Sequence, residues 1–220
     1  MKSLLQNLMR KFGYKMVRYE SLAYDRRILE IYELFEVVTN IIEKNLIKGV
    51  FVECGFGYGR SFAVLSHFAT KYKRKIYGFD SFSGFPNVLE IDQSIRNPKK
   101  GEWSVRSEKE AIKSMVNLGI FADNQGFALE KVIFNEKIKN PIPSQEIALL
   151  HIDLDLYEGY KYALVTFWDQ VEIGGIVIFD EYKLTNWPGA TAAINEFLVA
   201  KNLNSSEIKE LKGKHYIVKR

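Results

Sequence analysis

Two apolar segments, separated by a stretch of helical length, constrain this chain more than any other feature. Residues 147–152 (IALLHI) and 176–179 (IVIF) are continuous apolar runs, typical of strands buried on both faces of a sheet. Between them, apolar residues recur at helical spacing from 156 to 171, and Gly174 and Gly175 are predicted to end that helix. A strand, a helix and a second strand form a right-handed crossover with parallel strands. The sequence therefore predicts an α/β fold built on a mostly parallel sheet.

Acidic residues follow both of these strands. Asp153 and Asp155 come after the first, and Asp180 and Glu181 come directly after the second. Parallel strands end at the same edge of a sheet, so Asp153, Asp180 and Glu181 are expected to converge there. Two carboxylates about 4 Å apart repel by roughly 4 kcal/mol near a protein surface, which favours a bound cation. Oxygen ligands suit Mg²⁺, Mn²⁺ or Ca²⁺ better than zinc. The alternative is that these strand ends are acidic because they face water.

Composition limits the class of protein. A chain of 220 residues, 47% hydrophobic and 26% charged, fits one globular domain. The single Cys54 rules out a disulfide framework within the chain and is compatible with a cytoplasmic location. No apolar run is long enough to span a bilayer, so no stable membrane insertion is expected. The net charge of +4 is too small and too diffuse to indicate nucleic-acid binding.

A glycine-rich segment follows a short apolar strand at residues 50–52. It begins at Glu53, continues through Gly55, Gly57 and Gly59, and leads into a helical pattern. Glycines between a strand and a helix let the backbone approach a ligand closely at the helix N-terminus. The spacing does not fit a dinucleotide-binding fingerprint. The acid at the start of the segment would repel a pyrophosphate but could accept hydrogen bonds from an ammonium group, as in S-adenosylmethionine. The alternative is a glycine turn that serves packing alone.

The next predicted strand, at residues 76–79, ends at Asp80. An acid in this position can hold the two hydroxyls of a ribose, although a lone Asp after a strand more often forms a turn. Because Asp80 comes in the right order after the glycine segment, the two together predict a nucleoside-binding site.

The remaining segments predict the domain organisation. Residues 1–24 are expected to form an amphipathic arm, which is a lid, a dimer contact or a helix packed on the domain rather than a membrane-surface helix. The arm suggests a homodimer or higher homo-oligomer. Residues 25–220 form a single domain, which carries an insertion near 87–106 and closes with an antiparallel C-terminal hairpin around Gly213. The insertion is either an acceptor-side loop, with Trp103 stacking on a sugar, or a plain surface loop.

Several short segments together resemble a known family. Residues 80–86 (DSFSGFP), 153–158 (DLDLYE) and 180–182 (DEY) are similar to the DSFEGLP, DGDLYES and DDY segments of the macrocin O-methyltransferase family. That family methylates sugar hydroxyls in macrolide and aminocoumarin antibiotics. Residues 53–59 and 188–197 also resemble its glycine loop and the helix after DDY. The combination is far more specific than any one motif.

The resemblance implies a Rossmann-like class I methyltransferase fold, with a seven-stranded sheet and helices on both faces. It also implies S-adenosylmethionine as methyl donor and Mg²⁺ or Mn²⁺ as metal. Asp153, Asp180 and Glu181 would hold the metal, and Asp153 would also be the catalytic base. The donor contacts would be Glu53, Gly55, Gly57, Gly59, Asp80 and Ser81. The acceptor contacts would be Tyr157, Trp187 and Trp103.

The chain departs from the family pattern at three places. Glu181 replaces the second Asp of DDY, and Leu154 replaces a glycine. The family's GWF.DTLP segment has no clear counterpart in residues 135–143. Three functions remain open: a metal-assisted O-methyltransferase acting on a sugar or glycan-type acceptor, a metal-independent class I methyltransferase acting on another small molecule, and a non-catalytic nucleoside-binding subunit.

Overall fold

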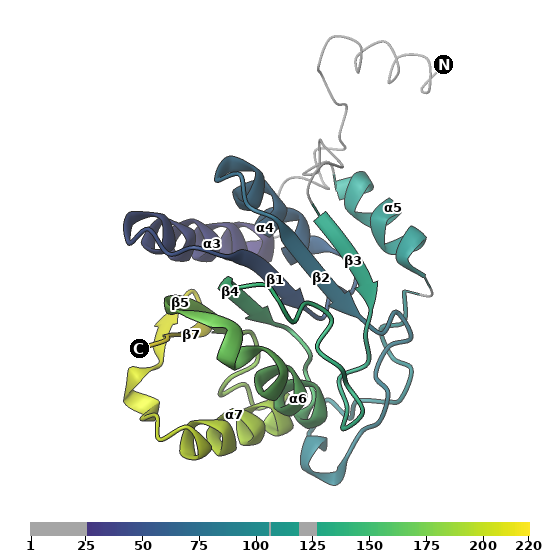
Figure 1. Ribbon diagram of the computed structural model, residues 1–220. Helices are drawn as coiled ribbons and strands as arrows, with labels where there is room; N and C mark the ends of the chain where they lie inside the picture. The colour runs from purple at the N-terminus through teal and green to yellow at the C-terminus, as the bar shows by residue number, and fades with distance from the viewer. Residues whose placement is uncertain (1–25, 106, 119–126) are drawn as a thin grey trace, which may run out of the picture.

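Seven strands form one sheet in the order β3-β2-β1-β4-β5-β7-β6 in the computed structural model, which describes residues 26–105, 107–118 and 127–220 (Figure 1). The strands are β1 Val50–Cys54, β2 Ile76–Asp80, β3 Phe127–Lys131, β4 Ile147–Ile152, β5 Val171–Phe179, β6 Lys209–Leu211 and β7 Lys214–Val218. All pairings among β1 to β5 are parallel, and β7 pairs antiparallel with both β5 and β6. The predicted class I methyltransferase sheet is therefore confirmed, including its antiparallel C-terminal strand.

Helices cover both faces of the sheet (Figure 1). One face carries α3 Arg26–Lys44, α4 Arg60–Lys71 and α5 Glu108–Leu118, and the other carries α6 Tyr157–Phe167 and α7 Pro188–Ala200. Short 3-10 turns are η1 Glu90–Asp92, η2 Trp168–Gln170 and η3 Ser205–Glu207. Side chains alternate along each strand, so that Phe51 packs with α3 and α4 while Val52 packs with α6 and α7. Within the described ranges, no helix is both long enough and apolar enough to cross a bilayer.

The helix predicted over 156–171 is shorter than expected. α6 ends at Phe167, a 3-10 turn follows, and β5 begins at Val171, so Gly174 and Gly175 lie inside a strand and do not end a helix. Gly174 has φ +84° and donates its N–H to the carbonyl of Lys219 at 2.7 Å. The pairing of β4 with β5 shifts register at this place. The two glycines therefore form an irregularity within the strand, which periodicity alone did not reveal.

The structure describes the predicted insertion, apart from residue 106, but not the predicted N-terminal arm. The insertion, described as far as residue 105, runs beside the loop that precedes α7, where the Ser94 hydroxyl donates to the carbonyl of Asn186 at 2.8 Å. The arm of residues 1–24 lies outside the described residues, so its predicted roles as a lid or dimer contact stay predictions.

Candidate active site

The carboxyl ends of β1, β2, β4 and β5 surround a cavity of about 580 Å³. Chain order reverses between β1 and β4, and open α/β sheets bind their ligands at such a switch point. The predicted site residues that line the cavity are Gly55, Gly57, Asp80, Ser81, Trp103, Asp153, Asp180, Glu181 and Trp187. Glu53, Gly59 and Tyr157 are not among its lining residues.

The glycine loop is held against the ends of two neighbouring strands. Gly55 has φ +93°, and a Cβ at this position would lie 1.6 Å from the carbonyl oxygen of Asp153. Gly57 has φ +49° and open space where a Cβ would project, and its N–H donates to Asp80 Oδ2 at 2.7 Å. Gly59, with φ +75°, is the N-cap of α4. The first glycine thus serves close packing, whereas the second exposes backbone to the cavity.

Asp80 holds the glycine loop in place through hydrogen bonds to backbone N–H groups. Its second oxygen, Oδ1, accepts the N–H of Phe82 at 2.6 Å. Burial raises the pKa of Asp80, and the backbone N–H groups that face it partly oppose the shift. Beside it, the Ser81 hydroxyl donates to the carbonyl of Gly84 at 3.0 Å. Asp80 therefore links the ends of β1 and β2 at the place where a nucleoside was predicted.

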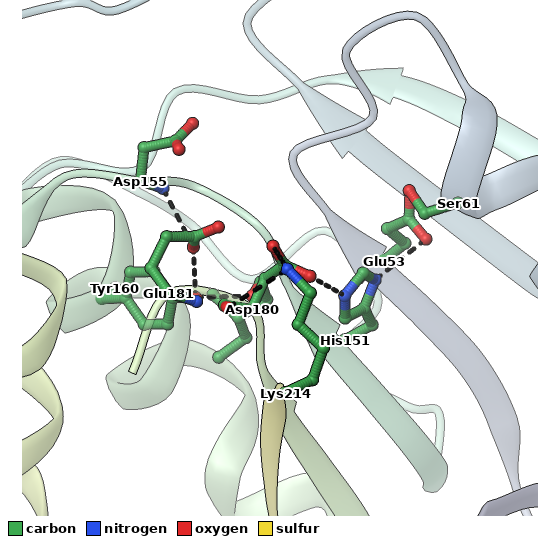
Figure 2. Close-up of polar contacts among 9 residues, drawn as sticks. Glu53, Ser61, His151, Asp155, Tyr160, Asp180, Glu181 and Lys214 are labelled. Carbon is green, nitrogen blue, oxygen red and sulfur yellow. Dashed lines mark hydrogen bonds and ion pairs between the residues drawn. The ribbon is translucent and has the colours of Figure 1, made fainter. Parts of the chain in front are cut away.

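Glu53 takes part in a buried network and does not face the cavity. It is fully buried in β1, where Ser61 donates to Oε1 at 2.8 Å and His151 Nδ1 lies 3.1 Å from Oε2 (Figure 2). Burial alone would lower the pKa of His151, but hydrogen bonds to Asp180 and Glu53 and their charges outweigh it and raise the pKa to about 10. His151 is therefore a cation at neutral pH. Ser61, which sequence reasoning missed, connects the network to the cavity.

Asp180 belongs to the same network. His151 Nε2 lies 3.6 Å from Asp180 Oδ1, and the ammonium of Lys214, which reaches in from β7, forms an ion pair with Oδ2 (Figure 2). Burial would raise the pKa of Asp180, but the hydrogen bond to His151 and the positive charges of Lys214 and His151 outweigh it and hold the pKa below its usual range. Asp180 is ionised and already faces two cations.

A second group of acids lies beside this network. Ligand oxygens of Asp153, Asp155 and Glu181 all lie within 4.8 Å of one another. Burial and the charge of Asp180 raise the pKa of Asp153 to about 7. Burial and neighbouring carboxylates also raise the pKa of Asp155 and of Glu181 well above the usual range. The Tyr160 hydroxyl lies against Glu181 Oε2 at 2.5 Å. A divalent cation would relieve the repulsion within this group.

The donor set fits a hard divalent ion. Three buried or half-buried carboxylates offer the oxygen ligands that Mg²⁺ and Mn²⁺ take. His151, Asp153 and Asp180 also lie within 4.8 Å of one another, but both ring nitrogens of His151 already face carboxylates, Nδ1 facing Glu53 and Nε2 facing Asp180. Of the predicted set, Asp153 belongs to both groups, Asp180 to the group with His151 and Glu181 to the oxygen group. Asp155, which the predicted set omitted, completes the oxygen group.

Asp155 has an unusual backbone. Its φ is +61°, and the N–H of Leu156 donates to the carbonyl of Leu154 at 2.6 Å, which makes a tight turn centred on the acid. Such turns are rare and strained, and strained residues concentrate at functional sites. The sequence signal was the second Asp of the 153–158 motif.

Aromatic side chains form the far wall of the cavity. Trp103 lies with its ring centroid 5.4 Å from that of Phe85 and 5.7 Å from that of Trp187. The guanidinium of Arg96 lies 4.7 Å from the Trp103 ring and 4.5 Å from the Trp187 ring. The two predicted tryptophans are therefore brought together. Tyr157 is not part of this wall, because its hydroxyl donates to Glu196 Oε2 of α7 at 2.6 Å.

Comparison with known proteins agrees with this architecture. Demethyldecarbamoylnovobiocin O-methyltransferase of Streptomyces niveus is 25% identical over 169 residues, which cover 74% of this chain and 62% of that enzyme. This chain therefore matches less than two thirds of that relative's length. The crystal structure of the calicheamicin methyltransferase CalS11 has a TM-score of 0.73 at 22% identity, covering 98% of this chain and 91% of that one. An apo structure of CalS11, described as a TDP-rhamnose 3′-O-methyltransferase, has a TM-score of 0.62 at 19% identity, covering 98% and 93%.

The family assignment comes from the sequence itself. Residues 16–214 match the sequence profile of the macrocin O-methyltransferase (TylF) family, and this range includes the glycine loop, Asp80 and both groups of acids. The solved structures, at 22% identity or less, show the same fold. The chain belongs to the macrocin O-methyltransferase family.

Proposed function

We propose that this protein transfers the methyl group of S-adenosylmethionine to a hydroxyl of a sugar or glycan-type acceptor, assisted by Mg²⁺ or Mn²⁺. One observation carries the proposal: a single cavity holds the glycine loop and Asp80 on one side and the carboxylate groups on the other. The cavity of about 580 Å³ falls within the ~300–1,000 Å³ typical of small-molecule sites.

The donor would occupy the half of the cavity lined by the glycine loop. Asp80 accepts the N–H groups of Gly57 and Phe82 and lines the cavity, so its carboxylate would be the group that holds a ribose hydroxyl. Gly57 lets the backbone approach the ligand. Glu53 would act on the amino-acid end of the donor through Ser61, which lines the cavity, since both Glu53 oxygens already have protein partners.

The chemistry requires little beyond alignment and removal of one proton. A sulfonium methyl group is already electrophilic, so the site must place an acceptor oxygen behind it at short range. A divalent ion, when bound to Asp153, Asp155 and Glu181, would lower the pKa of the acceptor hydroxyl. Asp153 takes the proton as general base. Asp180 also lines the cavity, but its Oδ2 is paired with the ammonium of Lys214.

The acceptor would lie against the aromatic wall. Trp103 is 49% exposed although it packs on two other aromatic rings, so it presents an indole surface to a sugar. CalS11 is described as acting on TDP-rhamnose, and the Streptomyces niveus relative as acting on demethyldecarbamoylnovobiocin. We therefore infer a nucleotide sugar or a glycosylated small molecule as the acceptor class.

The test is methyl transfer from labelled S-adenosylmethionine to a panel of TDP-sugars and glycosides, read by mass shift. Asp153→Asn should lower kcat at least 100-fold and leave the donor Kd within about twofold by calorimetry. Asp80→Ala should instead weaken donor binding at least tenfold. Asp169→Asn, at an exposed acid far from the cavity, is the matched control.

Three results would contradict parts of the proposal. Full activity of Asp153→Asn would remove the assigned base. Activity that survives metal chelation would favour a metal-independent methyltransferase. A wild-type protein that binds no S-adenosylmethionine would leave only a non-catalytic role.

A further inference from the structure

A buried carboxylate from the insertion caps a helix far away in the sequence. Asp92, in η1, is 1% exposed. Its Oδ2 accepts the N–H of Leu89 at 3.0 Å, and its Oδ1 accepts the N–H of Tyr157 at 2.7 Å. Tyr157 is the first residue of α6, whose own N-cap, Leu156, has no side-chain oxygen that could cap the helix. The capping group for α6 therefore comes from the insertion.

The same carboxylate also lies against the start of α7. Gly189 is the second residue of α7, and a Cβ there would lie 1.9 Å from Asp92 Oδ1. Only glycine leaves room for the carboxylate at this position. The N-cap of α7, Trp187, makes no side-chain capping bond. One negative charge thus lies at the positive ends of two helix dipoles.

These two helices follow the two loops that carry the acids. Asp153 and Asp155 lie between β4 and α6, and Asp180 and Glu181 lie between β5 and α7. Asp92 is hydrogen-bonded to the first residue of α6 and packs against the second residue of α7, so one carboxylate links the spacing of the two loops. That spacing determines whether acids from both loops meet.

We propose that Asp92 is a positioning residue that joins the acceptor-side insertion to both acid-bearing loops and sets the geometry of the carboxylate cluster. This inference rests on the proposed function. Asp92 touches neither the cavity nor the acids, so it acts through the starts of α6 and α7. The insertion therefore has a second role besides lining the acceptor side.

The first test removes each partner of the contact in turn. Asp92→Asn keeps the shape and removes the charge. Tyr157→Pro removes the N–H at the first helical position, where proline is well tolerated, and Leu156 already has the extended conformation that precedes proline. Tyr157→Ala is its matched control, because it loses the same side chain and keeps the N–H. Glu90→Gln, an exposed acid on the same turn, is the control for Asp92→Asn.

Gly189→Ala fills the space that the Asp92 carboxylate occupies beside α7 and removes no polar group. Alanine is the better helix former, so helix propensity alone predicts a more stable α7. If the added methyl group displaces Asp92, α7 should instead become less stable. Faster exchange in α6, a separate helix, would show that the added methyl group acts through Asp92.

The readouts separate this inference from the proposed function. Hydrogen exchange needs no substrate: Asp92→Asn, Tyr157→Pro and Gly189→Ala should speed exchange of the hydrogen-bonded amides that follow the first turns of α6 and α7 at least tenfold. With an acceptor, the same variants should lower kcat at least tenfold and leave the KM for S-adenosylmethionine within twofold. Exchange equal to that of the controls, or faster exchange with unchanged kcat, would overturn the inference. A wild-type protein with no methyl transfer contradicts the proposed function, while hydrogen exchange still decides whether the contact holds both helices.

Discussion

Replacement of Lys214 by methionine tests the electrostatic balance of the site directly. The Lys214 ammonium is paired with Asp180 in a region that also contains Asp153, Asp155 and Glu181. Methionine keeps most of the length and the apolar stem of the side chain and removes its charge. The change leaves His151 as the remaining cation paired with Asp180 among the described residues.

The size of the effect follows from burial and distance. Opposite charges about 3 Å apart attract by roughly 5 kcal/mol at an effective dielectric constant of 20, and loss of one partner from a buried pair costs about 3–5 kcal/mol. The side chain of Lys214 is 24% exposed and that of Asp180 is 14% exposed. Solvent screens part of the attraction, so we expect the free energy of unfolding to fall by about 2–3 kcal/mol. For a chain of this size that lowers Tm by about 4–12 °C.

The assay is thermal unfolding of the metal-free protein, followed by titration with Mn²⁺. Lys212→Met is the matched control: Lys212 lies in the same hairpin, and its ion pair with Glu33 joins side chains that are 45% and 49% exposed. We expect that control to change the free energy of unfolding by no more than about 1 kcal/mol. Lys214→Met should also bind Mn²⁺ more tightly, about tenfold, because a competing cation has gone. Equal Tm values for the two variants would refute the reasoning.

Two further predictions concern the same edge of the sheet. Because burial and repulsion raise the pKa of Asp153 to about 7 and raise those of Asp155 and Glu181 as well, the folded metal-free protein holds protons that the unfolded chain has released. Its stability should therefore fall as pH rises from about 4 towards 7. The Tm increase caused by Mn²⁺ should be larger at pH 8 than at pH 6, because fewer protons then compete with the ion. An equal increase at both pH values would count against a metal site here. Gly55→Ala, which would place a Cβ 1.6 Å from a backbone oxygen, should cost at least about 3 kcal/mol in chemical denaturation. Gly57→Ala, with open space around it, should cost only about 1–2 kcal/mol, and similar losses for both would contradict the packing role given to Gly55.

The sequence was sufficient for most of the fold because the strongest signals are local. Buried parallel strands read as short apolar runs, and each run led to a strand where it was expected. The predicted end of α6 was wrong because it, too, rested on local signals. Val171 continues the helical spacing, and the glycines at 174 and 175 suggest a helix terminus, yet pairing with β4 and β7 places all three residues in a strand. Tertiary pairing decided between two local patterns that agree equally well with the sequence.

Three of the four acids of the site could be predicted, but Asp155 and the partners of the acids could not. Asp153, Asp180 and Glu181 follow strands whose ends must meet, so convergence follows from topology. Lys214 reaches Asp180 because of the register in which β7 pairs with β5, where Phe179 lies opposite His215. No periodicity in the sequence gives that register. The pairing of Asp180 with the Lys214 ammonium, beside the three other acids, therefore depends on the hairpin.

Asp92 could not be predicted from the sequence either, because its role depends on partners that are far away in the chain. An acid in a polar insertion gives no signal of burial, and a glycine at the second position of a helix gives no signal of a contact. Their roles exist only as a pair, because the carboxylate fits only where the Cβ is missing. Residues that face the ligand can be found from motifs, since chemistry fixes their type. The role of a residue that holds those motifs in place depends on partners far away in the sequence, so a three-dimensional structure was needed to identify Asp92.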